Sequence, residues 1–327
     1  MRTIMYSEAI REAMQEEMRK DKKVFLIGED VAQGYRGAFG VSKGLYEEFG
    51  AKQVIDTPIC ENAIIGSAIG SALLGMKPIA EIMFEDFITV CFDQIVNHAA
   101  KIKFMSGEQY DVGIVIRTPG GSGGGTGPHH SQCLEAIFMH IPGLLVVMPS
   151  NAYDAKGLLK TAIHCSDPVL FFEHKKLYKT KSEVPTAEYT VPFGQGRVVR
   201  EGQDMTVVAI SHMVNVAEEA ADELKKHHNF ELEIIDPRTI VPLDLELIGE
   251  SLQKTNKAVV LEEGVLRGGV GSEISARIHE TYFDELDYPV TCIASRNIPI
   301  PMTPIMEKSV IPNKDRIVQE ICNLVGL

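Results

Sequence analysis

Several motifs that would place this chain in a common functional class are missing from its sequence. Its six cysteines contain no Cys-x-x-Cys pair, so neither a zinc knuckle nor a disulfide scaffold is predicted, and reduced thiols are expected. No set of His, Asp and Glu has the spacing of a transition-metal site. The N-terminus has no basic segment followed by an apolar run, and no stretch approaches the ~18 uncharged apolar residues of a membrane span. We therefore expect a soluble, cytoplasmic protein.

Positive charge is also scarce. The chain has 32 Lys and Arg against 45 Asp and Glu, which gives a formal net charge of −13. Nucleic-acid phosphates are bound by clustered Lys and Arg, and the one dense basic run, at residues 173–181, is short enough to be a solvated loop. A nucleic-acid surface is therefore excluded.

A glycine-rich segment from Gly120 to Gly127 is followed by Pro128, His129 and His130. A nucleotide-binding P-loop would end in Gly-Lys-Ser/Thr, which is missing here. A dinucleotide fingerprint would continue directly into a helix, which Pro128 and the paired histidines do not favour. Two interpretations stay open: a flexible lid carrying a histidine that moves protons near neutral pH, or an ordinary loop.

Short apolar runs alternate with helical patterns along the whole chain, which predicts parallel sheets covered on both faces by helices. The expected strands are 24–28, 54–56, 78–84, 112–117, 144–147, 169–172, 205–210, 232–235, 258–261 and 290–293. The expected helices are 7–19, 61–74, 87–104, 131–140, 152–165, 214–226, 245–253, 271–280 and 315–325. At 327 residues the chain can form two cores. We predict two α/β domains, at 1–180 and 195–327, joined by a linker at 181–194 where the apolar rhythm stops.

One acidic residue stands at the start of an otherwise uncharged segment. From Glu61 to Leu74 the chain is rich in Ala, Gly, Ser and Ile, which predicts a helix packed on nearly every side. Gly66 and Gly70 are four residues apart on one face and leave room for a neighbouring backbone. Two interpretations of Glu61 are possible: a partner of the helix dipole, worth ~0.3–1 kcal/mol, or a catalytic carboxyl group.

The order of short motifs along the chain is more specific than any one of them. These motifs are Asp56-Thr57-Pro58-Ile59, Glu61, Gly66, Gly70, Met83-Phe84-x-x-Phe87, Phe92-Asp93-Gln94-Ile95, Met105-Ser106-Gly107, His130-Ser131-Gln132, Ile141-Pro142-Gly143-Leu144, Pro149-Ser150-Asn151, Asp154-Ala155-Lys156-Gly157-Leu158-Leu159 and Glu262-Glu263-Gly264. In this order, over essentially the whole chain, the sequence resembles the β subunits of thiamine diphosphate-dependent 2-oxo acid dehydrogenase complexes. These belong to the transketolase-like superfamily. The resemblance implies a pyrimidine-binding domain followed by a transketolase C-terminal-like domain.

The resemblance also implies roles for individual residues. Glu61 matches the acid that hydrogen-bonds N1′ of the cofactor's aminopyrimidine ring, so it would be both catalytic and cofactor-binding. Ile59, Met83 and Phe87 match positions that line that ring. His130 matches the catalytic histidine of a mobile active-site loop, and its neighbour His129 is the alternative.

Two ion sites follow from the same resemblance. A potassium ion would be held by backbone oxygens at the positions that match Ile114, Ala162, Ile163, Cys165 and Asp167. Magnesium and the diphosphate are held in such enzymes by a Gly-Asp-Gly segment, and this chain has none. The resemblance therefore implies an α subunit that supplies this half of the site, in an α2β2 heterotetramer. The C-terminal domain would contact the α subunit and a dihydrolipoyl acyltransferase core that carries the lipoyl domain.

The implied activity is that of an oxidoreductase acting on an oxo group with a lipoyl acceptor. The substrate would be pyruvate, decarboxylated oxidatively, or acetoin, cleaved, with reductive acylation of the lipoyl group; a branched-chain 2-oxo acid is the alternative. A non-catalytic assembly subunit is a second alternative, and a stand-alone fragment of a transketolase-type or oxoacid–ferredoxin enzyme is a third. The lack of clustered cysteines opposes the iron–sulfur enzyme.

Overall fold

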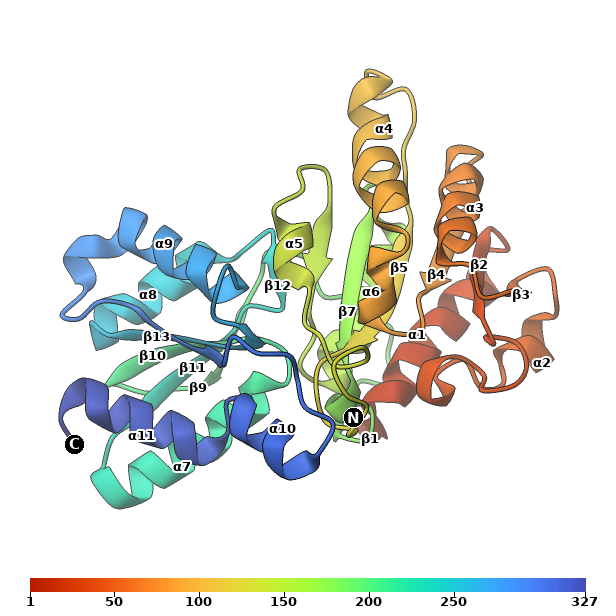
Figure 1. Ribbon diagram of the computed structural model, residues 1–327. Coiled ribbons are helices and arrows are strands. Elements are labelled where there is room, and N and C mark those ends of the chain that lie inside the picture. Colours follow the sequence, from red (N-terminus) through yellow and green to blue (C-terminus); the bar gives the residue numbers. More distant parts are fainter. The chain divides into compact units, whose positions relative to one another are not determined.

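A computed structural model describes residues 1–327, which form two compact α/β units (Figure 1). Unit 1 comprises Met1–Gly120 and Ile137–Phe193, and unit 2 comprises Gly121–Ala136 and Gly194–Leu327. The predicted fold class, two domains built on mainly parallel sheets, is confirmed. The glycine-rich segment from Gly121 onward and both adjacent histidines belong to unit 2, whereas the sequence placed them in the first of two continuous domains.

The sheet of unit 1 is parallel and buried. Its strands, in spatial order, are β6 (Leu145–Val147), β7 (Val169–His174), β5 (Val115–Gly120), β4 (Lys77–Glu81), β2 (Val24–Glu29) and β3 (Val54–Thr57). Their continuous apolar runs fit strands covered on both faces. Because parallel strands end at the same edge, the residues that follow β2, β3 and β4 lie at one side of the sheet.

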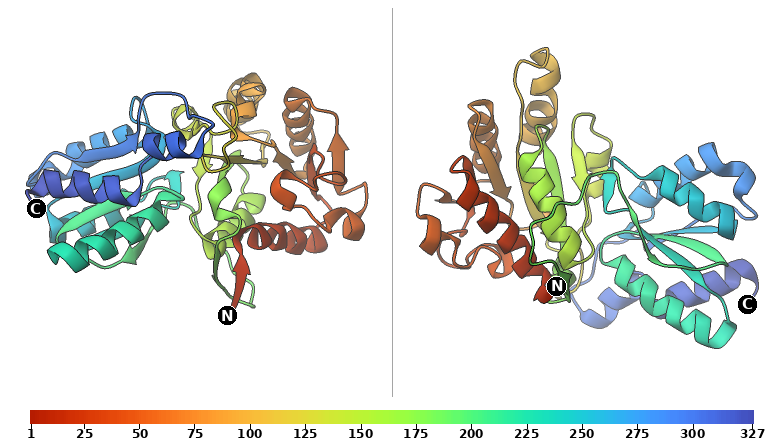
Figure 2. Two further views of the ribbon diagram at one scale, coloured as in Figure 1. Left: turned by 60° about the horizontal axis from the view of Figure 1, so that its bottom comes forward. Right: turned by 180° about the vertical axis from the view of Figure 1, so that it is seen from behind.

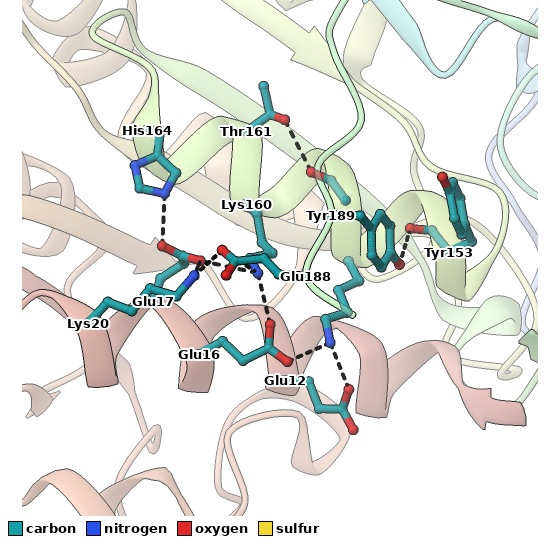
Figure 3. A network of polar contacts seen from close by, with 12 residues as sticks. Glu12, Glu16, Glu17, Lys20, Tyr153, Lys160, Thr161, His164, Glu188 and Tyr189 are labelled. Atoms are coloured by element: carbon teal, nitrogen blue, oxygen red, sulfur yellow. Dashed lines mark hydrogen bonds and ion pairs between the residues drawn. The ribbon is translucent and has the colours of Figure 1, made fainter. Parts of the chain in front are cut away.

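Helices α1 (Tyr6–Lys20) and α6 (Ala152–His164) lie side by side in unit 1 (Figure 2). Their contact includes an ionic network of lysines, glutamates and a histidine (Figure 3). Lys160 is fully buried there, with its Nζ 2.8 Å from Glu16 Oε2. Helix α3 (Glu61–Leu73) packs on β4. The remaining helices are α2 (Leu45–Phe49), α4 (Ala100–Met105) and α5 (Glu135–Met139).

The single long helix predicted at 87–104 is wrong. The segment is a 3₁₀ helix at Glu85–Thr89, a π-helix at Gln94–Ala99 and then α4. Val90 is 50% exposed, whereas its neighbour Cys91 is buried. A π-helical turn contains an extra residue, so the side chains rotate out of the 3.6-residue pattern on which the prediction relied.

The predicted linker contains a strand. β8 (Lys181–Val184) pairs antiparallel with β1 (Arg2–Met5), and Val184 is completely buried. Both strands are four residues long, and neither has an apolar run, so their pairing partner and not their composition makes them strands.

The sheet of unit 2 has the order β14 (Thr291–Ser295), β13 (Ala258–Val265), β10 (Met205–Ala209), β11 (Leu232–Asp236) and β9 (Arg197–Arg200), with β9 the antiparallel edge. Helices α8 (Leu245–Thr255) and α9 (Val270–Tyr282) cover one face, and α7 (Met213–His228) and α11 (Lys314–Val325) cover the other (Figure 1). The sequence did not predict β9, β12 (Thr239–Val241) or α10 (Pro304–Val310). No helix combines the length and apolar character that crossing a bilayer requires. All six cysteines are free thiols.

Candidate active site

Glu61 is the first residue of α3, and three residues separate it from the end of β3. The N-cap residue, Cys60, makes no side-chain capping bond, so the positive end of the helix dipole faces the acid. The Glu61 side chain is half-buried, and its carboxylate makes no hydrogen bond or ion pair within the chain. An interaction with the helix dipole acts through the charge of the acid and leaves its oxygens free to accept further hydrogen bonds. This carboxylate is therefore available to a ligand.

Two titratable groups lie close to Glu61. Glu29, at the carboxyl end of β2, has its pKa raised by burial and by the charges of Asp30 and Glu61. The buried Cys91 thiol has its pKa raised to about 12 by burial and by the charge of Glu61. The carboxyl end of β2 and the turn that follows the 3₁₀ segment Glu85–Thr89 thus lie near the start of α3.

Three apolar side chains were also predicted for this site, and all three belong to unit 1. Ile59, two residues before Glu61, is 75% exposed. Met83 and Phe87 follow β4 and are half-buried. Phe87 is fixed by an edge-to-face contact with Phe84, with ring centroids 6.1 Å apart. Binding sites for small molecules commonly combine apolar side chains with a few polar groups that fix the orientation of the ligand.

Unit 2 contains a pocket of about 410 Å³. The residues that follow the glycine-rich segment form one wall, which includes His129, Gln132 and Cys133, and β13 contributes Glu263. The Glu263 side chain is buried, and its Oε1 accepts a hydrogen bond from the Ser122 backbone N–H at 2.5 Å. This bond ties the glycine-rich segment to the sheet of unit 2.

The two histidines differ in their surroundings. His129 is exposed and lines the pocket. His130 is half-buried, does not line it, and has its backbone held by Gly127 and Thr126. Glu61 belongs to unit 1 and both histidines belong to unit 2.

Comparison with known proteins decides the family. "Transketolase, pyrimidine binding domain" matches residues 2–181, and "Transketolase, C-terminal domain" matches residues 194–317. The β subunit of acetoin:2,6-dichlorophenolindophenol oxidoreductase from Bacillus subtilis (strain 168) is 44% identical, covering 99% of this chain and 98% of its own length. The 2-oxoisovalerate dehydrogenase β subunit of the same organism is 45% identical, and the pyruvate dehydrogenase E1 component β subunit of Rickettsia felis is 43% identical; each comparison covers 97% of both chains.

The chain belongs to the family of 2-oxo acid and acetoin dehydrogenase β subunits. A solved structure described as a split gene transketolase, inactive β4 tetramer, has a TM-score of 0.81 at 21% identity over 99% of both chains and confirms the fold. Thiamine diphosphate is the cofactor of this family, and its pyrimidine gives the first domain its description. A β subunit implies an α partner.

One face of the β subunit's helix α3 is uncovered. Gly66 and Gly70 are exposed, and a Cβ added at either would meet nothing within 4 Å. The expectation of a helix packed on nearly every side is therefore wrong for the single chain, because the small residues that suggested burial face solvent here.

The five positions of the predicted potassium site lie where α6 ends and β5 and β7 begin. The Ile114 carbonyl accepts a hydrogen bond from the Val169 N–H at 2.9 Å, and the Ala162 carbonyl accepts one from the Cys165 N–H at 3.1 Å. The Asp167 carboxylate is paired with Lys103 at 2.7 Å. Carbonyl oxygens have a second lone pair, so the backbone, and not side chains, offers ligands here.

The sequence prediction missed a buried ionic cluster in unit 1. Glu81, Arg117 and Glu173 stand in three adjacent strands, and Arg117 is paired with both acids. The available signal was the placement of a charged residue late in each of three otherwise apolar strand patterns. The register Glu81↔Arg117, which brings the first two together, is a property of the sheet.

Proposed function

We propose that this chain is the β subunit of a thiamine diphosphate-dependent pyruvate or acetoin dehydrogenase that acylates a lipoyl group reductively. The observation that carries the proposal is the unpaired Glu61 carboxylate at the start of α3. Ile59, which is exposed, and Met83 and Phe87, which are half-buried, would line the ring. A scaffold subunit would have no use for an unpaired acid among apolar groups. The branched-chain 2-oxo acid alternative is supported by the 45% identity to the 2-oxoisovalerate dehydrogenase β subunit.

Each residue of the site has a role in this proposal. When bound, thiamine diphosphate supplies the carbon nucleophile and the electron sink that the reaction needs. Glu61 holds a proton at N1′ of the aminopyrimidine. Ile59, Met83 and Phe87 pack on the ring and keep water from the carboxylate, which strengthens its hydrogen bond.

We assign the diphosphate half of the site to an α subunit. No Gly-Asp-Gly segment is present, and no group of three or more His, Cys, Asp or Glu side chains in the chain could hold a metal. Magnesium would therefore be held by the α subunit of an α2β2 heterotetramer. The uncovered face of α3, with Gly66 and Gly70, fits a helix that a second subunit covers. A dihydrolipoyl acyltransferase core is the further partner.

We place potassium at the backbone oxygens of Ile114, Ala162, Ile163, Cys165 and Asp167. The Cys165 carbonyl lies so close to Gly113 that a Cβ there would be 2.7 Å from it, so the two loops are held together. Elemental analysis of the complex tests both ions. The proposal requires magnesium and potassium in the complex and no magnesium in the isolated chain.

Co-purification with the α partner tests the proposed function. The complex is expected to turn over pyruvate or acetoin at least about tenfold faster, in kcat/KM, than branched 2-oxo acids, because added methylenes are worth ~1–3 kcal/mol in a fitted pocket. The isolated chain should be inactive and should bind the cofactor weakly. Robust activity of the isolated chain would overturn the shared site, and preference for branched acids would favour the alternative.

Alanine variants of the two histidines test their assignment. His130→Ala is expected to lower lipoyl acylation about 100-fold while decarboxylation with an artificial electron acceptor changes little, because general acid–base catalysis contributes ~10²–10⁴-fold. His129→Ala, the control, should change acylation by less than about threefold. The reverse result would assign the role to His129, which lines the pocket.

A further inference from the structure

Arg117 is one of the most buried charged residues in unit 1. It lies in β5, is 1% exposed, and contacts acids on both sides. Its Nη1 donates to Glu81 Oε2 at 2.7 Å, and its Nε and Nη2 donate to the two oxygens of Glu173 at 2.7 and 3.0 Å. A bidentate pair on one side and a single bond on the other leave the guanidinium no freedom to rotate.

The cluster also includes Tyr178, whose hydroxyl donates to Glu173 Oε2 at 2.6 Å. Burial, followed by the charge of Glu173, raises the pKa of Tyr178 well above its usual value, so the hydroxyl remains a donor. Burial raises the pKa of Glu173 although Arg117 opposes it. Packed apolar side chains in place of this cluster would stabilise the core at least equally well. Stability alone therefore does not explain why Arg117, Glu81 and Glu173 are buried here.

Glu81 connects the cluster to the segment 30–42, which follows Glu29. Its Oε1 accepts a hydrogen bond from the Ala38 N–H at 2.5 Å. Gly37 has φ 76°, and a Cβ there would lie 3.0 and 3.1 Å from the Glu81 oxygens and 2.8 Å from Ser42 Oγ. The segment is thus clamped against one carboxylate, and only glycine fits the contact.

From this clamp, aromatic rings lead to the candidate active site. Phe39 contacts Tyr178 with ring centroids 5.2 Å apart, and it contacts Phe84 edge-to-face at 6.1 Å. Phe84 in turn holds Phe87 at 6.1 Å. Phe39 has φ 57° and is 55% exposed, so the clamped backbone and not burial keeps it in this position.

We propose that Glu81 and Arg117 are positioning residues, which clamp the segment 30–42 so that Phe39 and Phe84 hold Phe87 in place for the pyrimidine ring. The inference rests on the proposed function. Both residues are 1% exposed and act through Phe39 and Phe84, so their loss weakens cofactor binding without removing the chemistry.

Glu81→Gln in the co-purified α/β complex tests the proposal. The glutamine keeps an oxygen for the Ala38 N–H but loses the charge that fixes Arg117. Isothermal titration with thiamine diphosphate and magnesium is expected to give a dissociation constant raised about tenfold, or ~1.4 kcal/mol. At saturating cofactor, kcat should stay within about threefold of the parent.

Glu16→Gln is the matched control. It removes a carboxylate from the ionic network between α1 and α6, where Glu16 pairs with the buried Lys160 (Figure 3) and with the buried Lys156. Its dissociation constant for the cofactor should equal that of the parent, even if its melting temperature falls as much as that of Glu81→Gln. If Glu81→Gln and Glu16→Gln lost the same amount of cofactor affinity, the cluster would only stabilise the fold and would not position Phe87.

Phe39→Ala keeps the proposal falsifiable if Glu81→Gln fails to fold. Phe39 is largely exposed, so the variant should fold, and cofactor binding should weaken about threefold to tenfold because the support of Phe84 is lost. Unchanged cofactor binding in Phe39→Ala would overturn the positioning role. If the parent complex bound no thiamine diphosphate at all, the proposed function itself would fail.

Discussion

Glu61→Gln is expected to lower the turnover of the co-purified α/β complex at least about 100-fold, because a positioned acid–base group contributes ~10²–10⁴-fold to a rate. The glutamine has the same shape and can still bond a ring nitrogen through its amide. It cannot hold a transferable proton there. Cofactor affinity, measured by isothermal titration, should therefore change much less than kcat.

Glu246→Gln is the control for the helix dipole. Glu246 is an exposed acid in the first turn of α8, as Glu61 is in the first turn of α3. Both substitutions remove a favourable dipole interaction of ~0.3–1 kcal/mol, so both should lower stability slightly. Only Glu61→Gln should remove turnover. Near-normal turnover of Glu61→Gln in an assembled complex would support the assembly-subunit alternative.

The chain is expected to lose stability as the pH rises from about 5 to about 9, because of one buried acid in unit 2. Glu262, in β13, is 1% exposed, and its pKa is raised to about 8 by burial and by the charge of Glu135. Hydrogen bonds from the Gly271 and Val270 backbone N–H groups oppose the rise. The folded chain therefore keeps a proton that the unfolded chain loses near its ordinary pKa of 4.5.

The sign of this effect follows from proton counts. Between pH 4.5 and about 8, the folded state binds more protons at Glu262 than the unfolded state does, so the free energy of unfolding falls as the pH rises. The full difference between the two pKa values corresponds to about 5 kcal/mol. Urea unfolding of the chain at pH 5, 7 and 9 measures the decline.

Glu262→Gln should flatten that pH dependence, since the amide stays neutral and its oxygen can still accept from Gly271. At pH 9 the free energy of unfolding of the variant should exceed that of the parent by up to about 5 kcal/mol. Glu250→Gln, an exposed change in the same unit, should keep the decline of the parent. A variant of Glu262 that still lost stability as steeply would show that another group is responsible.

The sequence predicted the features that local composition controls. Continuous apolar runs located β2, β4 and β7, and the uncharged segment after Glu61 located α3, because burial on both faces of a parallel sheet requires such runs. The ordered motifs identified the family and singled out Glu61. Roles for Glu61, Ile59, Met83, Phe87 and the histidines stay predictions until the variants are measured.

Other features depended on pairing partners distant in the sequence. β8 lies in the predicted linker because β1 supplies its hydrogen bonds, and the π-helix at Gln94–Ala99 breaks the pattern by which helices are recognised. No local signal near Glu262 indicated that Glu135 and the start of α9 would surround it.

Glu61 has some features that the sequence predicts and others that only the tertiary structure determines. The sequence alone predicts its position at the start of an uncharged helix, because helix boundaries depend on neighbouring residues. Its lack of a partner within the chain, its closeness to Glu29 and Cys91, and the clamp that runs from Arg117 through Glu81 to Phe39 were decided only by the tertiary structure. The physical reason is that parallel strands far apart in the sequence end at one edge of the sheet, and only their register determines which charges meet there.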